Sequence, residues 1–319
     1  MMRFLQHSEI DRANWDACVD RSPNSIIYAY SWYLDRVAPG WGALVEGDYD
    51  TIMPLPMRSK AMIQYVYQPY FVQQLGVFGK YSHHPEVCDR FLEAVFEKFR
   101  WVDYNLNSHN VTSAAGKSYC RQKGRTHLLD LVQPVEQIRA AYSQNTLRNL
   151  AKAKRMGVFI VKNSNPEEII DAFRNHKGKI LHAYGAREYE LLKRLTYNAL
   201  HLGLAHVSAA YDHSNSFCGG IIVLKSKHKA VLLFTGSTPL AFENGAMFSL
   251  VDDFIATNAG NEMVLDFEGS SDPNLARFYK GFGAKEIVFL RIQHNRLPPG
   301  VEELVKCSRF FRKKIQIWF

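Results

Sequence analysis

The stretch LDFEGSSDPNLARFYKGFGA, residues 265–284, indicates a strand, a loop and a short helix in close succession. Its apolar start predicts a strand over 263–267. Asp272 followed by Pro273 is typical of the N-cap and first residue of a helix, and the glycines after Lys280 end that helix. A further strand is predicted over Glu286–Ile292. The second half of the chain therefore closes on strand, short helix, strand.

The residues before this stretch extend the pattern. Apolar alternation predicts a three-stranded meander, and Gly245 opens a helix that Gly260 closes. The three strands are predicted over His206–Tyr211, Phe217–Leu224 and Ala230–Phe234, and helices over 143–156, 166–183 and 187–202 precede them.

The first half repeats the order of helices, meander, long helix and closing strands. Its strands are predicted over Ala43–Glu46, Thr51–Arg58, Gln64–Val72, Trp101–Leu106 and Thr126–Leu131, with a helix over Pro85–Arg100. Pro54 and Pro56 make the second of these an edge or bulged strand. The repeated order predicts an α+β protein of two similar lobes, 1–132 and 133–319, with helix 143–156 as a basic linker.

The 319 residues carry a net charge of +8, and all of that excess follows residue 132. Residues 1–132 hold fourteen basic and fourteen acidic side chains, whereas residues 137–166 hold six basic and no acidic ones. Localised positive charge favours an anionic partner such as a phosphate, a nucleotide or RNA. A solvated helix face explains the same run without any partner.

Composition and motifs exclude several classes of protein. The five cysteines are widely spread with no C-x-x-C pair, which favours a reducing, cytoplasmic compartment over a disulfide framework. No apolar run is long enough to span a membrane, and the N-terminus turns acidic where a signal peptide would be apolar. The histidines lack metal-ligand spacing, so no metal is expected. No Walker loop, G-x-S-x-G or G-x-G-x-x-G is present.

These elements together resemble the GNAT fold of acyl-CoA N-acyltransferases. The order meander, helix, strand, short helix, strand is similar to that fold, and Asn274, Ala276, Tyr279 and Gly283 stand in the order found near the end of many GNAT domains. Within that superfamily, TLRNLAKAKRMGV (146–158) resembles the basic helix of Fem-type aminoacyltransferases. The segments NGAMFSLVDDFIATNAG and FYKGFG also resemble the second lobe of those enzymes.

The resemblance implies two tandem GNAT-like lobes, each with a mixed, mostly antiparallel sheet flanked by helices. It also implies a donor that is either an acyl-CoA or an aminoacyl-tRNA. Coenzyme A normally needs a glycine loop that holds its pyrophosphate at a helix N-terminus. With Gly245 as the first glycine of such a loop, Phe242 replaces the polar residue and Met247 the small one. This departure favours aminoacyl-tRNA.

Acyl transfer to an amine needs a proton acceptor, and two acids are candidates. Glu268 and Asp266 lie at the end of the predicted strand 263–267, beside the apolar Phe267. The alternatives for Glu268 are a capping role at the helix that begins near Asp272 and an ordinary ion pair with Arg277 or Lys280. The resemblance makes Tyr279 a proton donor for the leaving group, and a packing role is its alternative.

Further residues are candidates for binding substrate. Arg148, Lys152 and Arg155 form one basic stripe at helical spacing, suited to phosphate. Gly236 and Ser237 permit close backbone approach, and YQPYFVQQLGVFG around Tyr70 and Gln74 suits a polar ligand, although a turn and strand packing explain these equally. The remaining candidates are Gly245, Phe267 and Arg277.

We therefore expect a cytoplasmic transferase that moves an acyl or aminoacyl group onto an amine. The Fem resemblance implies a bacterial enzyme with a UDP-linked cell-wall precursor as acceptor. One alternative is an acyl-CoA-dependent N-acyltransferase on a small molecule or polysaccharide precursor, and another is a non-catalytic RNA- or anion-binding protein. The basic, aromatic tail SRFFRKKIQIWF is expected to pack as a strand or helix rather than rest on a membrane.

Overall fold

A computed structural model describes residues 1–60, 62–113, 119–181, 184–269 and 272–297. The chain forms two compact units. Of the described residues, unit 1 holds 1–125 and 287–297, and unit 2 holds 126–286. This division differs from the predicted break at 132/133, because the long strands β8 (Cys120–Asp130) and β14 (Lys285–Asn295) each have residues in both units.

Unit 1 contains a four-stranded sheet in the order β1-β2-β3-β6 and the strands β4, β5, β7 and β14 of a second sheet. Its strands are β1 (Met2–Leu5), β2 (Gly42–Glu46), β3 (Thr51–Leu55), β4 (Met57–Lys60), β5 (Ile63–Val66), β6 (Phe78–Gly79) and β7 (Trp101–Asn105). Its helices are α1 (Arg12–Arg21), α2 (Ser31–Val37) and α3 (Pro85–Lys98), with single turns at His7–Glu9 and Ile27–Ala29. The apolar face of α3 is buried, as its periodicity predicts.

Prolines set two boundaries in unit 1. The run predicted over Thr51–Arg58 is divided at Pro56 into β3 and β4, which belong to different sheets, because proline lacks the N–H that a continuous ladder needs. The strand predicted over Gln64–Val72 ends at Val66 and is wrong beyond it. Pro69 removes another donor there, and Phe71 has a left-handed backbone with φ of 59°.

Unit 2 is built on the strand order β8-β13-β12-β11-β10-β9. The predicted meander is confirmed as β10 (Ala205–Tyr211), β11 (Phe217–Lys225) and β12 (Lys229–Ser237), all antiparallel. The outer strands are β9 (Phe159–Lys162) and β13 (Val264–Asp266), and the helices are α4 (Val135–Ala140), α5 (Gln144–Arg155), α6 (Pro166–Asn175), α7 (Lys177–Leu181), α8 (Ala186–His201), α9 (Pro239–Asn244), α10 (Ala246–Asn258) and α11 (Pro273–Lys280).

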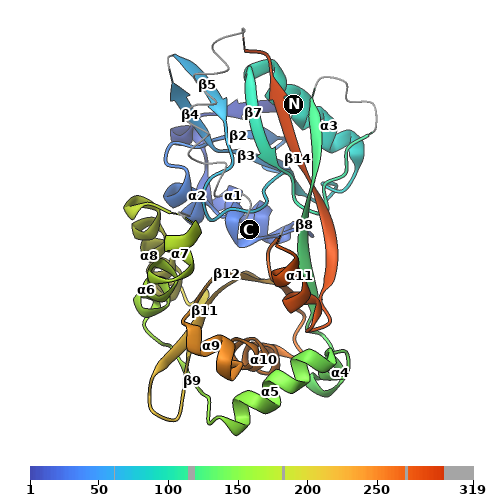
Figure 1. Ribbon diagram of the computed structural model, residues 1–319. Coiled ribbons are helices and arrows are strands. Elements are labelled where there is room, and N and C mark those ends of the chain that lie inside the picture. Colours follow the sequence, from blue (N-terminus) through green and yellow to red (C-terminus); the bar gives the residue numbers. More distant parts are fainter. Residues whose placement is uncertain (61, 114–118, 182–183, 270–271, 298–319) are drawn as a thin grey trace. The chain divides into compact units, whose positions relative to one another are not determined.

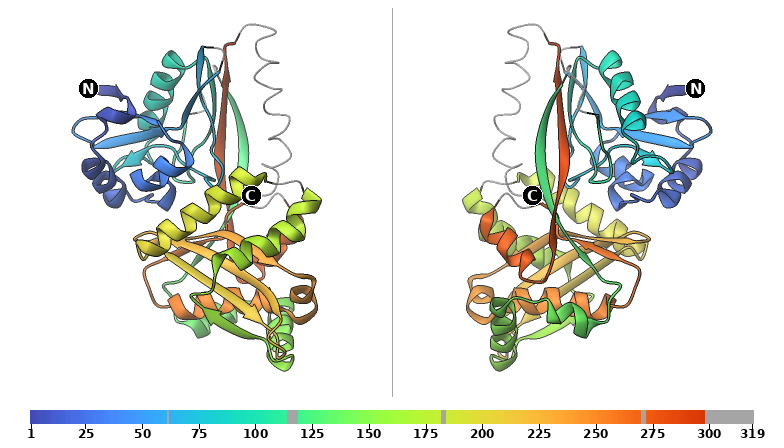
Figure 2. Two further views of the ribbon diagram at one scale, coloured as in Figure 1. Left: turned by 90° about the vertical axis from the view of Figure 1, so that its left-hand side faces the viewer. Right: turned by 90° about the vertical axis from the view of Figure 1, so that its right-hand side faces the viewer.

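Helices cover both faces of the meander in unit 2 (Figures 1 and 2). Helices α6 and α8 pack on one face, and α10, with α5 and α9 beside it, packs on the other. The α10 side holds the core, in which Leu250, Phe254 and Ile255 meet Ile221 and Val223 of β11. The prediction of an α+β protein is confirmed by this arrangement of helices on both faces of a mixed sheet.

Candidate active site

Strand β13 places the candidate acids of unit 2. It pairs in parallel with β12 through Lys229–Val231 and antiparallel with β8 through Leu128–Asp130. Strand β12 then continues to Ser237, whereas β13 ends at Asp266. The chain after Asp266 therefore leaves the sheet where one neighbouring strand still runs on, and Glu268 lies at this exit.

Asp266 anchors the exit from the strand. The residue is 1% exposed, and its Oδ1 atom accepts hydrogen bonds from the hydroxyl of Thr126 and, at 2.9 Å, from the backbone N–H of Glu268. Its Oδ2 atom lies 3.6 Å from the ammonium of Lys229. Because both carboxylate oxygens face partners within the protein, Asp266 is suited to hold the loop in position rather than to exchange protons with a substrate.

Glu268 has the features of a proton acceptor. It is 5% exposed, and burial raises the pKa of its carboxyl well above the usual value near 4.5. Its backbone is left-handed, with φ of 61°, a conformation that disfavours a residue with a long side chain. Lys280, one predicted ion-pair partner of Glu268, instead binds Glu286 at 2.8 Å. The surrounding structure thus holds a buried acid on a strained backbone.

Tyr279 of α11 lies beside these acids in an aromatic cluster. Its ring stacks on Phe267, with the centroids 4.8 Å apart, and Phe267 stacks in turn on Phe282. Burial raises the pKa of the Tyr279 phenol, and the nearby charges of Glu268 and Asp272 raise it further. A phenol in this position stays protonated at neutral pH. The cluster also buries Phe267 fully, so packing explains why an aromatic residue stands between the two acids.

His127 belongs to the same cluster and was not predicted from the sequence. It lies on β8 and is fully buried, and its ring centroid is 5.7 Å from that of Tyr279. Its Nε2 atom lies 3.9 Å from Oε2 of Glu286. The sequence shows only a polar residue next to an apolar run. The position of His127 beside Tyr279 follows from the pairing of β8 with β13.

The N-terminus of α10, where the predicted glycine loop would hold coenzyme A, is packed closely against α5. Gly245 has φ of 76° and joins α9 to α10. A Cβ atom on Gly245 would lie 2.6 Å from the carbonyl oxygen of Asn149 in α5, and the N–H of Ala246 donates to the side chain of Asn244 at 3.0 Å. Gly245 therefore permits close packing of α5, which accounts for the glycine without a ligand.

Gly236 and Ser237 end β12. A Cβ atom on Gly236 would lie 1.9 Å from the carbonyl oxygen of Ile169, so this glycine lets α6 pack on the sheet. Ser237 is half-buried. The close approach predicted at Gly236 is thus made by a helix of the same unit, and substrate contact there remains a prediction.

The basic stripe lies on the solvent side of α5. Ser143 caps helix α5, since its hydroxyl accepts from the N–H of Thr146, and the helix buries Thr146 and Ala153. Arg148 and Arg155 are exposed and Lys152 is half-buried, as is expected of one stripe. Leu147 is also exposed, because the buried face is centred on Thr146 and Ala153.

The structure does not join this stripe to the acids. Among the residues that the structure describes, none of the three stripe side chains contacts Asp266, Glu268 or Tyr279. Arg277 is exposed near the end of α11. Phosphate binding by these side chains remains a prediction.

In unit 1, the glutamine-rich segment forms an internal polar network. Gln74 is buried, its Nε2 donates to Gln73 at 2.6 Å, and its Oε1 accepts from the N–H of Ser108 at 2.9 Å. Tyr70 is half-buried against Phe71. The described contacts of Gln74 thus serve the loop itself, and ligand binding by Tyr70 and Gln74 is untested.

Within the described residues, no three His, Cys, Asp or Glu side chains converge as metal ligands would. In the same part of the chain, no helix is both long enough and apolar enough to cross a membrane. The tail SRFFRKKIQIWF, residues 308–319, which is expected to pack as a strand or helix, lies outside the described residues.

Comparison with known proteins identifies the fold. No protein-family model and no curated protein sequence matches the chain. Among solved structures, FemX is similar with a TM-score of 0.62 at 11% identity, over 88% of this chain and 96% of FemX. L-PGS from Bacillus licheniformis is similar with a TM-score of 0.55 at 10% identity, over 94% of this chain and 97% of that one.

A third structure extends the same result. The C-terminal domain of a putative lysylphosphatidylglycerol synthetase from Agrobacterium fabrum has a TM-score of 0.55 at 11% identity, over 93% of this chain and 95% of that one. The fold is therefore of the Fem-like, tandem GNAT type, as the residues around Tyr279 and in α5 predict. At these identities the comparison defines the fold, and the chemistry has to be argued from the site.

Proposed function

We propose that this protein transfers an acyl or aminoacyl group to an amine, with Glu268 as the catalytic base. The observation that carries the proposal is the buried, left-handed Glu268, held by the Asp266–Thr126 hydrogen bond beside the phenol of Tyr279. Strained backbone and a carboxyl with a raised pKa are costly to stability, and they cluster at active sites.

The raised pKa suits the reaction. An α-amino group titrates at about 7.7–8.0, so a carboxylate whose pKa lies closer to that range accepts its proton more effectively than an ordinary one. In the proposed step the amine nitrogen bonds to the carbonyl carbon and its proton passes to Glu268. The bond from that carbon to the leaving oxygen or sulfur breaks, and Tyr279 supplies a proton to the leaving atom.

An aminoacyl ester is the donor that the site favours over coenzyme A. At the N-terminus of α10, where a pyrophosphate would accept backbone hydrogen bonds, Gly245 is packed against Asn149 and the N–H of Ala246 already donates to the side chain of Asn244. FemX and the lysylphosphatidylglycerol synthetases are similar in fold, and the latter by name attach a lysyl group. We therefore propose aminoacyl-tRNA as donor and an amine of a cell-envelope precursor, UDP-linked or similar, as acceptor.

The test is a transfer assay with purified full-length chain. Labelled aminoacyl-tRNAs and labelled acyl-CoAs are offered with UDP-linked peptide precursors as acceptors. Glu268→Gln should reduce kcat by roughly 100-fold or more, as loss of a general base does. Glu262→Gln, at an exposed acid of the same unit, is the matched control and should leave kcat unchanged.

Three outcomes would contradict the proposal in different ways. Full activity of Glu268→Gln would remove Glu268 from the mechanism. Transfer from acyl-CoA alone would establish the other donor class. Steeply salt-dependent RNA binding that ignores aminoacylation, with no transfer from either donor, would indicate the non-catalytic alternative.

A further inference from the structure

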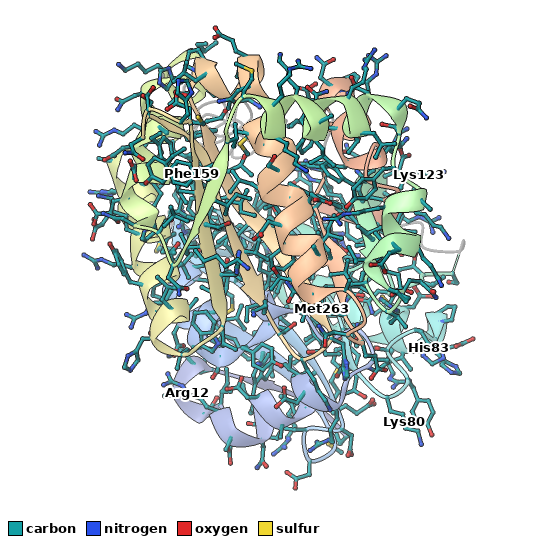
Figure 3. The ribbon with its side chains drawn as sticks, turned by 90° about the horizontal axis from the view of Figure 1, so that it is seen from below. Arg12, Lys80, His83, Lys123, Phe159 and Met263 are labelled. Carbon is teal, nitrogen blue, oxygen red and sulfur yellow. The ribbon has the colours of Figure 1, made fainter. Side chains whose placement is uncertain are left out.

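Helices α5 and α9 form one exposed surface that the proposed chemistry does not use. The two helices are in contact, and Gly245 at the end of α9 packs against Asn149 of α5. Figure 3 shows the side chains of α5 extending outward on the side away from α10. We define the α5/α9 surface as the basic residues Arg148, Lys152, Lys154 and Arg155 with the apolar residues Leu147, Met156, Leu240 and Phe242.

The basic residues of this surface keep their charge uncompensated. In the described part of the chain, none of the four makes an ion pair, and Arg148 only bonds to the amide of Asn145 at 3.1 Å. Neighbouring basic residues behave differently, since Arg139 pairs with Asp252 and Lys162 with Asp253. One acid, Glu243, is exposed on α9, so the surface remains strongly positive.

Large apolar side chains are exposed among these charges. Phe242 is 80% exposed on α9, and Leu240 of the same helix is also exposed. Leu147 and Met156 are exposed near the two ends of α5. Single exposed apolar residues are ordinary, but several on two adjoining helices that also carry uncompensated cations suit a partner that is both anionic and apolar.

We propose that the α5/α9 surface docks on an anionic lipid bilayer, with the cations at the headgroups and Phe242 inserted at the acyl boundary. Such a bilayer is the partner that attracts basic side chains and buries neighbouring apolar ones. RNA fits less well. Its single strands are bound by aromatic stacking platforms, and the surface offers one aromatic ring and no Tyr, Trp or His. The duplex form would leave the apolar side chains exposed to water.

The docking surface is separate from the candidate acids. Its residues make no contact with Glu268 or Tyr279 within the described residues, so the Glu268→Gln variant should still bind vesicles. Failure of the transfer proposal and failure of the docking proposal are therefore distinguishable.

The test is co-sedimentation of the full chain with vesicles at low salt. Phosphatidylcholine vesicles are compared with mixed phosphatidylcholine–phosphatidylglycerol vesicles. Each basic residue near an anionic surface strengthens partitioning about five-fold, so the triple variant Arg148→Gln, Lys152→Gln, Arg155→Gln should bind mixed vesicles roughly 100-fold more weakly. Phe242→Ser should weaken binding about ten-fold or more, through loss of buried apolar area.

Matched controls use the same changes elsewhere in unit 2. Arg187→Gln, Lys227→Gln, Lys285→Gln removes three exposed charges, and Ile180→Ser removes an apolar side chain that is also 80% exposed. Both controls should bind mixed vesicles as the unchanged protein does. Equal binding to neutral vesicles would overturn the proposal, and so would unchanged binding of the triple variant. If the unchanged protein binds RNA but no vesicles, and the triple variant loses the RNA binding, the surface binds RNA instead of a bilayer.

Discussion

The hydroxyl of Thr126 on β8 donates a hydrogen bond to the same carboxylate oxygen of Asp266 that accepts the backbone N–H of Glu268. Thr126 therefore acts on the candidate base through Asp266. It ties the end of β13 to β8 and fixes the peptide from which Glu268 projects. The relationship joins residues 140 positions apart and lies wholly in the buried interior of unit 2.

Thr126→Val should lower both stability and activity. It removes one of the buried donors to the Asp266 carboxylate and leaves the backbone N–H of Glu268 as the remaining donor to Oδ1, which costs about 1–3 kcal/mol of the free energy of unfolding. We expect kcat to fall because the Glu268 peptide loses its support, measured by urea unfolding alongside the transfer assay. Thr196→Val is the control, since Thr196 is equally buried and its hydroxyl donates to Leu192 in α8. A loss of activity in both variants would show that Thr126 has only a general structural role.

Glu268→Gln should change how stability depends on pH. The folded protein keeps the Glu268 proton to a higher pH than the unfolded chain, in which the carboxyl titrates near 4.5. Between these two pKa values the folded state binds more protons, so this group's contribution to stability is full below 4.5 and is lost as pH rises through the folded pKa. The side chain of the Gln variant does not titrate, so its contribution to stability does not change with pH.

The variant should therefore gain stability relative to the unchanged protein as pH rises above 5, by at most about 1.4 kcal/mol per pH unit. Thermal or urea unfolding between acidic and neutral pH measures this difference. Glu262→Gln, at an exposed acid, should show no such trend. A pH-independent difference for Glu268→Gln would mean that the folded pKa of Glu268 is ordinary.

Glu268→Gly should stabilise the protein while removing activity. Glycine adopts the left-handed backbone at residue 268 without the penalty of about 1–2 kcal/mol that a side chain incurs, and it removes a buried ionisable group. Urea unfolding measures the gain. Asn215→Gly is the control, because Asn215 has φ of 58° in an exposed turn and asparagine tolerates this conformation, so little change is expected. A destabilised Glu268→Gly would show that side-chain contacts outweigh the backbone strain.

Local patterns predicted much of unit 2, whereas pairing over long distances was not predictable. The meander and α10 followed from apolar alternation and from Gly245 and Gly260. Strand β9 was missed because four largely exposed residues carry no clear period. The start of β8 was missed because Cys120–Arg125 is polar.

The candidate site shows the same limit. Glu268 and Tyr279 stand close in the sequence and could be proposed from it. The choice between Glu268 and Asp266 could not be made, because it depends on Thr126 and Lys229, which lie in other strands. The place of His127 beside Tyr279 depends in the same way on the pairing of β8 with β13.

Gly245→Ala should destabilise the protein more than a glycine change with the same backbone strain and open surroundings. Gly245 and Gly260 have similar φ values of 76° and 81°, so alanine costs about 1–2 kcal/mol at either position. At Gly260 no atom lies within 4 Å of the added Cβ, but at Gly245 the carbonyl oxygen of Asn149 lies 2.6 Å away. The backbone of α5 has to move, so thermal unfolding should show a clearly larger loss for Gly245→Ala. Equal losses would mean that α5 is not held against Gly245, and the N-terminus of α10 would then be open to a phosphate donor.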